Sequence, residues 1–112
     1  MALHTFRKVE RIRKRAEFQR TYKNGAKYQT PHFRVSICSN TLPYARLGIT
    51  VAKRIGSAAQ RNGVKRRVRE FFRLNKGSLP ASCDLVITAR EGAAGLTFWQ
   101  VSDELKGLFR GL

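Results

Sequence analysis

The chain has 112 residues, 42% of them hydrophobic, and its 23 Lys and Arg against 7 Asp and Glu give a formal net charge of +16. The length and hydrophobic content suit one domain with a single core, spanning residues 1–112. So large a positive excess repels itself in a small domain, and nucleic acid is the favoured partner because its phosphates neutralise the charge.

Several other classes of protein are not favoured. Cys38 and Cys83 lie far apart in apolar, strand-like runs, which favours buried free thiols over a disulfide. No CxxC or CxxH spacing exists and the histidines are His4 and His32, so no zinc site is expected. No apolar run approaches the roughly 20 residues of a membrane span, and the N-terminus lacks the apolar core of a signal peptide. We therefore expect a cytoplasmic protein without a membrane partner, and no obligate protein partner is evident.

The first predicted helix runs from Ile12 to Lys23. The Asn24-Gly25 pair ends it, since both residues accept a positive φ at a helix C-terminus. One arc of this helix gathers cations and aromatic rings, namely Arg11, Lys14, Arg15, Phe18 and Tyr22. Aromatic residues four apart on a helix are usually core residues, and spacing alone favours that role. Beside cations at the mouth of a groove they would instead stack on unpaired bases.

Three strands are predicted next, over residues 26–29, 32–39 and 45–52. The last two alternate apolar and polar residues and are separated by turn residues 40–44, which predicts that they pair as a hairpin. Gly48 lies inside the third of these strands. A strand glycine is costly, so we expect another group to approach the backbone closely there.

The second predicted helix follows Ser57, which suits an N-cap. One side, over roughly 140° of the helical wheel, is cationic: Arg61, Asn62, Lys65, Arg66, Arg69 and Arg73. The other side fits a core: Val64, Val68, Phe71 and Leu74. Within residues 48–73, no acid occurs before Glu70. The absence of interspersed acids favours a polyanion-binding face over an ordinary solvated surface.

The remaining elements complete one α+β domain. Residues 83–89, CDLVITA, are a near-continuous apolar run and predict a central strand buried on both faces. A final helix is predicted from a Thr97 cap to residues 108–110, with Trp99 assigned to packing. The predicted order is α-β-β-β-α-β-α.

Residues 48–73 resemble the signature of the bacterial ribonuclease P protein component. In that family a strand ends in V-S/A-K-K/R and a helix opens A-x-x-R-N-R-x-K-R-x-x-R-E. The corresponding residues here are Val51-Ala52-Lys53-Arg54, Ala58, Arg61-Asn62-Gly63, Lys65-Arg66 and Arg69-Glu70. The Phe18 and Tyr22 spacing, Gly25, and the D-x-V-x-x-A-R pattern of residues 84–90 extend the resemblance over nearly the whole chain.

The resemblance implies a fold and a function. The fold would be a two-layer α-β-β-β-α-β-α sandwich with a four-stranded sheet and a left-handed β-α-β crossover, although about 98% of such crossovers are right-handed. The chain would be the protein subunit of ribonuclease P, which assists a catalytic RNA in removing the 5′ leader of precursor tRNA. The RNA and substrate would hold the Mg²⁺ ions and perform the chemistry, so no catalytic or metal-binding residue is expected in this chain.

Two binding surfaces follow from the resemblance. The catalytic RNA would dock on Arg61, Asn62, Lys65, Arg66 and Arg69. The single-stranded leader would occupy a groove between the first helix, the sheet and the second helix, lined by Phe18, Tyr22, Arg11, Arg15, Arg34 and Lys53. The groove's small-sided face would comprise His32, Ser36, Gly48 and Thr50 with Arg34. This role for Phe18 and Tyr22 reverses the preference for core packing.

Two positions depart from the family pattern. Gly63 replaces the second Arg of R-N-R, which removes one phosphate contact and costs about 0.5–1 kcal/mol of helix stability relative to Ala. Arg67 is poorly placed on the wheel to replace that contact. Ser36 stands where an aromatic residue often faces the leader, which predicts weaker stacking there.

Three alternatives share parts of this description. A structural ribosomal RNA-binding protein without processing activity would have similar size and charge. A helix-turn-helix DNA-binding domain would need a short helix upstream of residue 57, where residues 47–51 alternate as a strand. An intrinsic nuclease using His4 and His32 as acid and base has no supporting motif.

Overall fold

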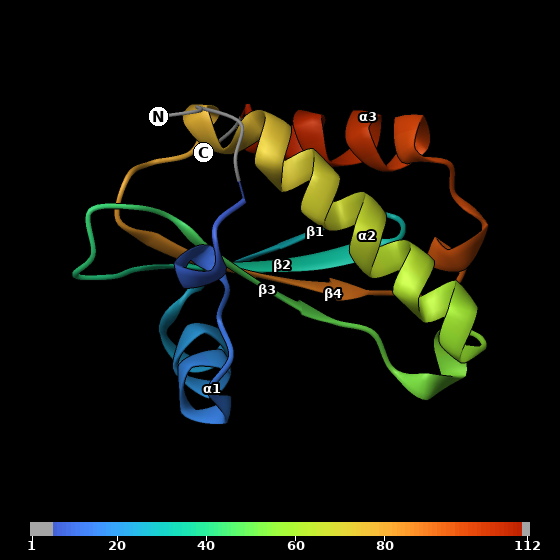
Figure 1. Ribbon diagram of the computed structural model, residues 1–112, viewed down its shortest axis with the longest axis horizontal. Coiled ribbons are helices and arrows are strands. Elements are labelled where there is room, and N and C mark those ends of the chain that lie inside the picture. Colours follow the sequence, from blue (N-terminus) through green and yellow to red (C-terminus); the bar gives the residue numbers. More distant parts are fainter. Residues whose placement is uncertain (1–5, 111–112) are drawn as a thin grey trace.

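A four-stranded mixed sheet forms the centre of the protein, in the order β1-β2-β4-β3 (Figure 1). The strands are β1 (Ala26–Gln29), β2 (Phe33–Ser39), β3 (Arg46–Thr50) and β4 (Cys83–Ala89). β2 pairs antiparallel with β1 and with β4, whereas β3 pairs parallel with β4. The computed structural model describes residues 6–110.

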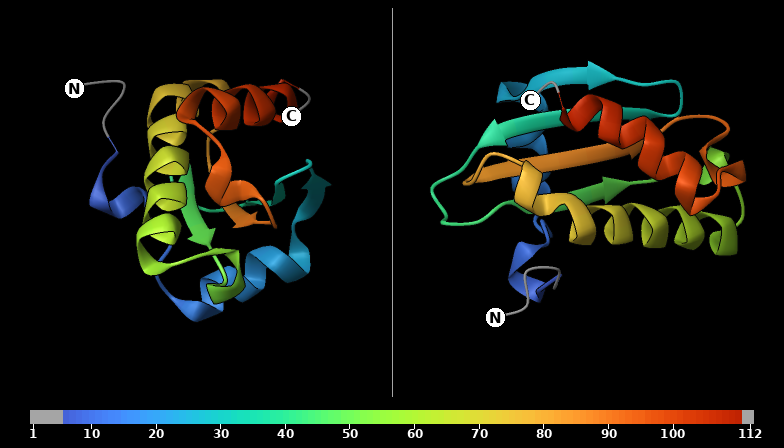
Figure 2. Two further views of the ribbon diagram at one scale, coloured as in Figure 1. Left: turned by 90° about the vertical axis from the view of Figure 1, so that its right-hand side faces the viewer. Right: turned by 90° about the horizontal axis from the view of Figure 1, so that it is seen from above.

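Three helices complete the predicted order: α1 (Arg15–Asn24), α2 (Ala58–Asn75) and α3 (Phe98–Phe109). α2 and α3 form a layer on one face of the sheet, and α1 crosses one end of the opposite face (Figure 1). The connection from β3 through α2 to β4 joins parallel neighbours and is left-handed, as the view from above shows (Figure 2). The α+β fold is therefore confirmed. Among the described helices, none has the length and apolar character needed to cross a membrane.

The predicted hairpin of β2 with β3 is wrong because β4 lies between them. Val35 of β2 pairs with Ile87 of β4, and Leu47 of β3 pairs with Leu85. β4 carries the longest apolar run, and the central position buries both of its faces, as predicted: Leu85, Val86 and Ile87 are fully buried. The sequence pattern identified the strands but could not show which neighbour each would choose.

The core lies between the sheet and the α2–α3 layer. Its side chains come from the sheet (Phe33, Val35, Leu47, Leu85, Ile87), from α2 (Val64, Val68, Phe71, Phe72) and from α3 (Val101, Leu105, Phe109). Each such side chain contributes about 1.5–3 kcal/mol when fully buried. Leu74 was predicted on this side of α2 but is 39% exposed.

Helix caps confirm two predicted starts. Ser57 accepts a hydrogen bond from the Gln60 backbone N–H, and Thr97 does the same for Gln100; both form capping boxes. Trp99, predicted to pack, is instead 73% exposed. Its neighbour Phe98 packs against the core, because the first turn of α3 can turn only one of two adjacent rings inward.

The start of α1 differs from the prediction. The helix begins at Arg15 rather than Ile12. Ile12 is buried, and its N–H donates to the Leu47 carbonyl at 2.9 Å, while Arg11 forms a parallel bridge with Leu47. Residues 6–14 therefore form a strap along β3, which includes the short 3-10 turn η1 (Lys8–Glu10). We call this segment the N-terminal strap.

Gly25 ends α1 for a different reason from the one predicted. Its φ is −82°, so no left-handed conformation is required. A Cβ at this position would lie 2.5 Å from the Thr21 carbonyl oxygen and 2.7 Å from that of Ile37. Glycine is needed because the end of α1 touches the β2 backbone.

The cysteines are free thiols, as predicted. Cys83 is buried, and burial, with a smaller contribution from the neighbouring Asp84 charge, raises its pKa to about 11. Cys38 is only half-buried. It pairs with Asp84 in the sheet while Ser39 pairs with Cys83, so the two cysteines face opposite sides of the sheet.

Candidate nucleic-acid interface

The position of α1 is set by an ionic cluster on the sheet face that α2 and α3 leave uncovered, which we call the open face. Asp84 of β4 is fully buried there. Its Oδ1 accepts from Arg46 Nε at 2.8 Å and from Asn40 Nδ2 at 2.8 Å. Its Oδ2 accepts from Arg46 Nη2 and from Arg20 Nη2 of α1, each at 2.7 Å. Arg46 Nη1 also donates to Glu17 of α1 at 2.8 Å.

Each charged group in this cluster stabilises the ionised form of its partners. Burial opposes ionisation of Asp84, but the hydrogen bonds from Arg46, Asn40 and Arg20 outweigh it and hold the pKa of that carboxyl below its ordinary value. The pKa of Glu17 is lowered chiefly by its hydrogen bond from Arg46. α1 is thus attached to β3 and β4 through two of its own charged side chains, Glu17 and Arg20.

Tyr22 extends from α1 across the open face. Its hydroxyl lies 3.0 Å from Thr50 Oγ1 and 3.1 Å from Thr88 Oγ1, so β3 and β4 hold its tip. The ring borders a hollow of about 510 Å³, which we call the sheet hollow. The hollow is lined by Tyr22, Lys27, Tyr28, Gln29, Arg34, Val35, Ser36 and Thr88. The structure therefore brings the predicted Tyr22, Arg34 and Ser36 together.

Tyr28 lies on the edge strand β1 and is 37% exposed. It pairs with Val35, whereas its neighbours Lys27 and Gln29 pair with Ser36 and Arg34. Side chains alternate along a strand, so the Tyr28 ring projects with Val35 on the sheet face that α2 and α3 cover. Lys27 and Gln29, which the sequence pattern did not single out, lie on the open face beside Ser36 and Arg34 and line the sheet hollow.

Phe18 lies one turn before Tyr22 on α1, in a second hollow of about 230 Å³, which we call the strap hollow. It is lined by Phe6, Arg11, Ile12, Arg13, Phe18, Leu47, Gly48, Ile49 and Arg69. A Cβ on Gly48 would lie 2.6 Å from Phe18 Cε1. The predicted close approach at Gly48 is therefore confirmed, and the approaching group is the Phe18 ring. Phe18 both packs on the sheet and borders the strap hollow.

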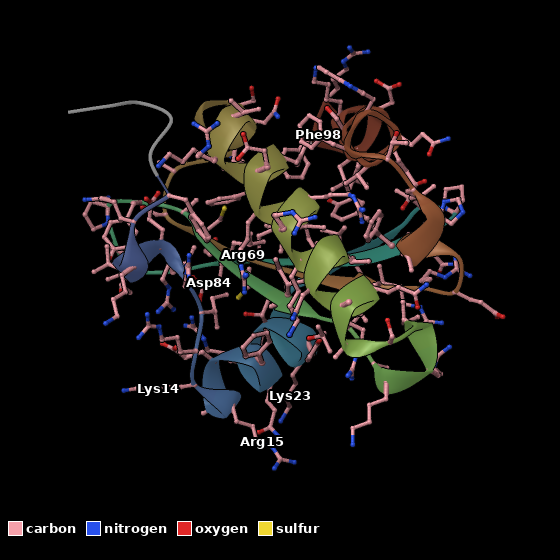
Figure 3. All side chains as sticks on the ribbon, turned by 45° about the vertical axis from the view of Figure 1, so that its right-hand side comes forward. Lys14, Arg15, Lys23, Arg69, Asp84 and Phe98 are labelled. Carbon is pink, nitrogen blue, oxygen red and sulfur yellow. The ribbon has the colours of Figure 1, made fainter. Side chains whose placement is uncertain are left out.

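Other predicted groove residues lie elsewhere. Arg15 is exposed and projects from α1 away from the sheet, as does Lys14 (Figure 3). Lys53 lies in the 3-10 turn η2 (Lys53–Ile55) after β3, is exposed and lines neither hollow. The His32 ring pairs with α3, since its Nδ1 is 2.8 Å from Glu104 Oε1.

Glu104 closes the loop between β1 and β2. Its Oε2 accepts from the His32 backbone N–H at 2.8 Å and from the Thr30 hydroxyl at 2.5 Å. Burial opposes its ionisation, but hydrogen bonds from Thr30 and His32 prevail and lower the pKa of Glu104. His32 therefore serves to fix this loop against α3 and is not part of the small-sided groove face.

The predicted docking residues form a cationic row on α2, which we call the α2 ridge: Arg61, Asn62, Lys65, Arg66 and Arg69. Within residues 6–110, no acid forms an ion pair with any of them. Glu70, the acid of α2, is paired with Arg73. Arg61 Nε is buried without a hydrogen-bond partner. The ridge is thus a set of donors whose charge the protein does not neutralise.

Position 63 is covered by a neighbouring guanidinium. Gly63 is buried within an unbroken α2, and Arg67 Nη1 lies 3.1 Å from where a Cβ would stand. A long helical side chain runs back toward the preceding turn, so Arg67 reaches over the residue four positions earlier. The wheel angle of Arg67 therefore understated how near its charge comes to position 63.

In the part of the chain that the structure describes, acidic and metal-ligating residues do not gather into a metal site, since no three of His, Cys, Asp and Glu are grouped as such a site requires. Glu10, for example, is buried and receives Lys76 Nζ at 2.8 and 3.0 Å and the Arg7 backbone N–H at 2.7 Å. Burial opposes ionisation of Glu10, but these hydrogen bonds lower its pKa. The acid holds the N-terminal strap to the end of α2.

An α+β domain with an unneutralised cationic helix beside a sheet face carrying aromatic rings defines a nucleic-acid-binding protein. Residues 6–112 match the family model described as Ribonuclease P. The "Ribonuclease P protein component" of Syntrophus aciditrophicus is 45% identical over 101 residues, covering 90% of this chain and 85% of the relative. That of Thermotoga maritima is 39% identical over 110 residues, covering 95% and 94%.

Solved structures agree with the sequence relatives. The Staphylococcus aureus RNase P protein matches with a TM-score of 0.85 and 36% identity, covering 92% of this chain and 94% of that chain. The Thermotoga maritima protein matches with a TM-score of 0.83 and 37% identity, covering 92% and 97%. The chain belongs to the bacterial ribonuclease P protein family. Its function as a ribonuclease P subunit, with RNA binding and tRNA processing, follows from that membership.

Proposed function

We propose that this chain acts within ribonuclease P by binding two RNA partners through different surfaces. The α2 ridge docks on the catalytic RNA, while α1 and the open face hold the single-stranded 5′ leader of precursor tRNA. The catalytic RNA and the substrate hold the Mg²⁺ ions and perform the cleavage, which takes place in the cytoplasm. The observation that carries this proposal is the unneutralised α2 ridge beside two aromatic-lined hollows.

The leader surface suits a strand of variable sequence. Phe18 and Tyr22 are one helical turn apart, about 6 Å along α1, and each borders its own hollow. Two rings at that spacing can meet neighbouring bases of an extended strand. Stacking on rings and charge from Arg11 and Arg34 accept any base, because every base has a flat face and every nucleotide a phosphate.

The acids of this chain favour chemistry in the RNA. Glu10, Glu17, Glu70 and Asp84 form ion pairs within the fold, and Glu104 accepts hydrogen bonds from Thr30 and His32. All five have a lowered pKa, so they are ionised hydrogen-bond acceptors rather than proton donors at neutral pH. They hold together the elements that present the binding surfaces.

Reconstitution with the catalytic RNA tests the proposal. Processing of precursor tRNA at low Mg²⁺ should increase when the protein is added, and the holoenzyme should bind leader-bearing substrate more tightly than mature tRNA. The absence of any stimulation would favour a structural RNA-binding role of the ribosomal kind. Cleavage that persists after the RNA has been digested would show an intrinsic nuclease and contradict the proposal.

A further inference from the structure

The strap hollow brings together cations from two separate segments and an aromatic ring from a third. Arg11 and Arg13 come from the N-terminal strap, Arg69 from α2, and Phe18 from α1 forms part of the lining. The Arg69 side chain projects from α2 on the side of the helix that faces β3 (Figure 3). The lining contains no acidic residue. A member of the α2 ridge therefore shares a hollow with Phe18, which we assigned to the leader surface.

The guanidinium groups of Arg11 and Arg69 are close enough to repel each other. Partial burial, and then the charge of Arg11, lower the pKa of Arg69. Arg11 is held in place by the Phe6 ring, whose centroid is 4.9 Å from its guanidinium carbon. The adjacent acid, Glu10, does not relieve the repulsion because Lys76 and Arg7 already occupy it.

Two cations held near each other without an acid are stabilised when an anion enters between them. Among the described residues, neither Arg69 nor Arg13 forms an ion pair or a side-chain hydrogen bond. Their forked N–H donors suit the oxygens of a phosphodiester. The floor is apolar, because Gly48 lets the Phe18 ring rest directly on the sheet.

We propose that Arg11, Arg13 and Arg69 together bind one phosphate of the leader strand, above the floor made by Phe18 and Gly48. Arg69 then belongs to the leader surface, and the catalytic RNA is left with Arg61, Asn62, Lys65 and Arg66. α2 thus lies between the two RNA partners and contacts a different one on each side. This inference rests on the proposed function, since it requires that the leader occupies the groove beside α1.

A matched pair of variants on α2 tests the assignment. Arg69→Gln and Arg66→Gln each remove one charge from the same helix, three residues apart. Arg69→Gln should weaken binding of leader-bearing precursor tRNA by the reconstituted holoenzyme about tenfold, with little change for mature tRNA or for assembly with the catalytic RNA. Arg66→Gln should do the reverse. Lys106→Gln on α3 controls for the loss of one charge anywhere on the surface.

An uncharged linkage in the leader backbone would identify the phosphate that these arginines bind. Single methylphosphonate substitutions placed along the leader should reveal one linkage at which the wild-type holoenzyme loses affinity. Arg69→Gln should show no further loss at that linkage, because the two changes remove the same interaction. Arg69→Lys, which keeps the charge but not the fork, should lose less than Arg69→Gln.

The results of these experiments distinguish failure of the Arg69 assignment from failure of the proposed function. If Arg69→Gln weakens assembly with the catalytic RNA and leaves leader discrimination intact, Arg69 returns to the docking surface and only this inference fails. The phosphate contact is likewise contradicted if the methylphosphonate effects and Arg69→Gln are additive at every linkage. If the wild-type holoenzyme does not distinguish leader-bearing from mature tRNA, the proposed function itself fails.

Discussion

Beneath α1, Arg20 and Arg46 converge on the buried Asp84, whereas along the α2 ridge the cations meet no acid. Both regions are rich in arginine: the first lies on the open face of the sheet, and the second on the exposed side of α2. In the first, each guanidinium is matched by a carboxylate at 2.7–2.8 Å. In the second, the same groups remain available to an external anion.

This difference shows that the few acidic residues determine whether the basic residues near them have a structural or a binding role. With 7 acids against 23 bases, a carboxylate converts the arginines around it into structural groups, and its absence leaves them as binding groups. The acids are concentrated where α1, the N-terminal strap and the β1–β2 loop are attached. The remaining charge repels itself until a polyanion is bound.

Replacing Asp84, the centre of the ionic cluster beneath α1, should cause the largest loss in the free energy of unfolding. Asp84→Ala leaves the partly buried Arg46 without its bidentate partner and should lower the free energy of unfolding by about 3–5 kcal/mol. Urea denaturation followed by circular dichroism measures this loss. Arg66→Ala, which removes a cation that has no acid, should leave the free energy of unfolding unchanged or raise it slightly. A loss for Asp84→Ala of under about 1 kcal/mol would contradict a structural role for the cluster.

Acid unfolding should depend on the same carboxylates. The pKa of Asp84, Glu17 and Glu10 is lowered by folding, so their stabilisation is fully present above the ordinary carboxyl pKa near 4 and is lost as pH falls through the lowered values. The free energy of unfolding should therefore fall steeply below about pH 4. Asp84→Asn should make that fall shallower, whereas substituting the exposed Glu91 should not change it.

Removing the Phe18 ring should weaken leader binding more than it destabilises the fold. Phe18→Ala should cost about 1–3 kcal/mol in affinity for leader-bearing substrate and much less for mature tRNA. Gly48→Ala should act in the same direction, because its Cβ would displace the ring from the sheet. Equal losses for both substrates, or an unfolded variant, would assign Phe18 to packing alone.

The smallest expected effects are those of single ridge cations. Arg61→Ala and Lys65→Ala should each weaken binding to the catalytic RNA and reduce the slope of log affinity against log salt by under about one unit. Arg20→Ala should leave that slope unchanged because Asp84 already neutralises its charge. An unchanged slope for both ridge variants would exclude phosphate contacts by these residues.

Much of the local structure could be predicted from the sequence. Ser57 and Thr97 marked the starts of α2 and α3 because capping depends on neighbours three residues away. β4 was recognised as central because both of its faces are apolar. The predicted hairpin does not form because β2 and β3 each pair with β4, which begins more than thirty residues after β3 ends. The prediction that Trp99 packs in the core was wrong because two adjacent aromatic residues could not both face the core.

By itself, the sequence determined the charge, the cationic side of α2 and the family, since these depend on residue types and short spacings. Only the tertiary structure decided which arginines are bound and which are free, because Arg20 and Asp84 are 64 residues apart in the chain. It also decided that Lys27 and Gln29 join Tyr22 in the sheet hollow and that Arg69 shares the strap hollow with Phe18. Ion pairs and hollows form between side chains from different elements, and local spacing does not show which elements will meet.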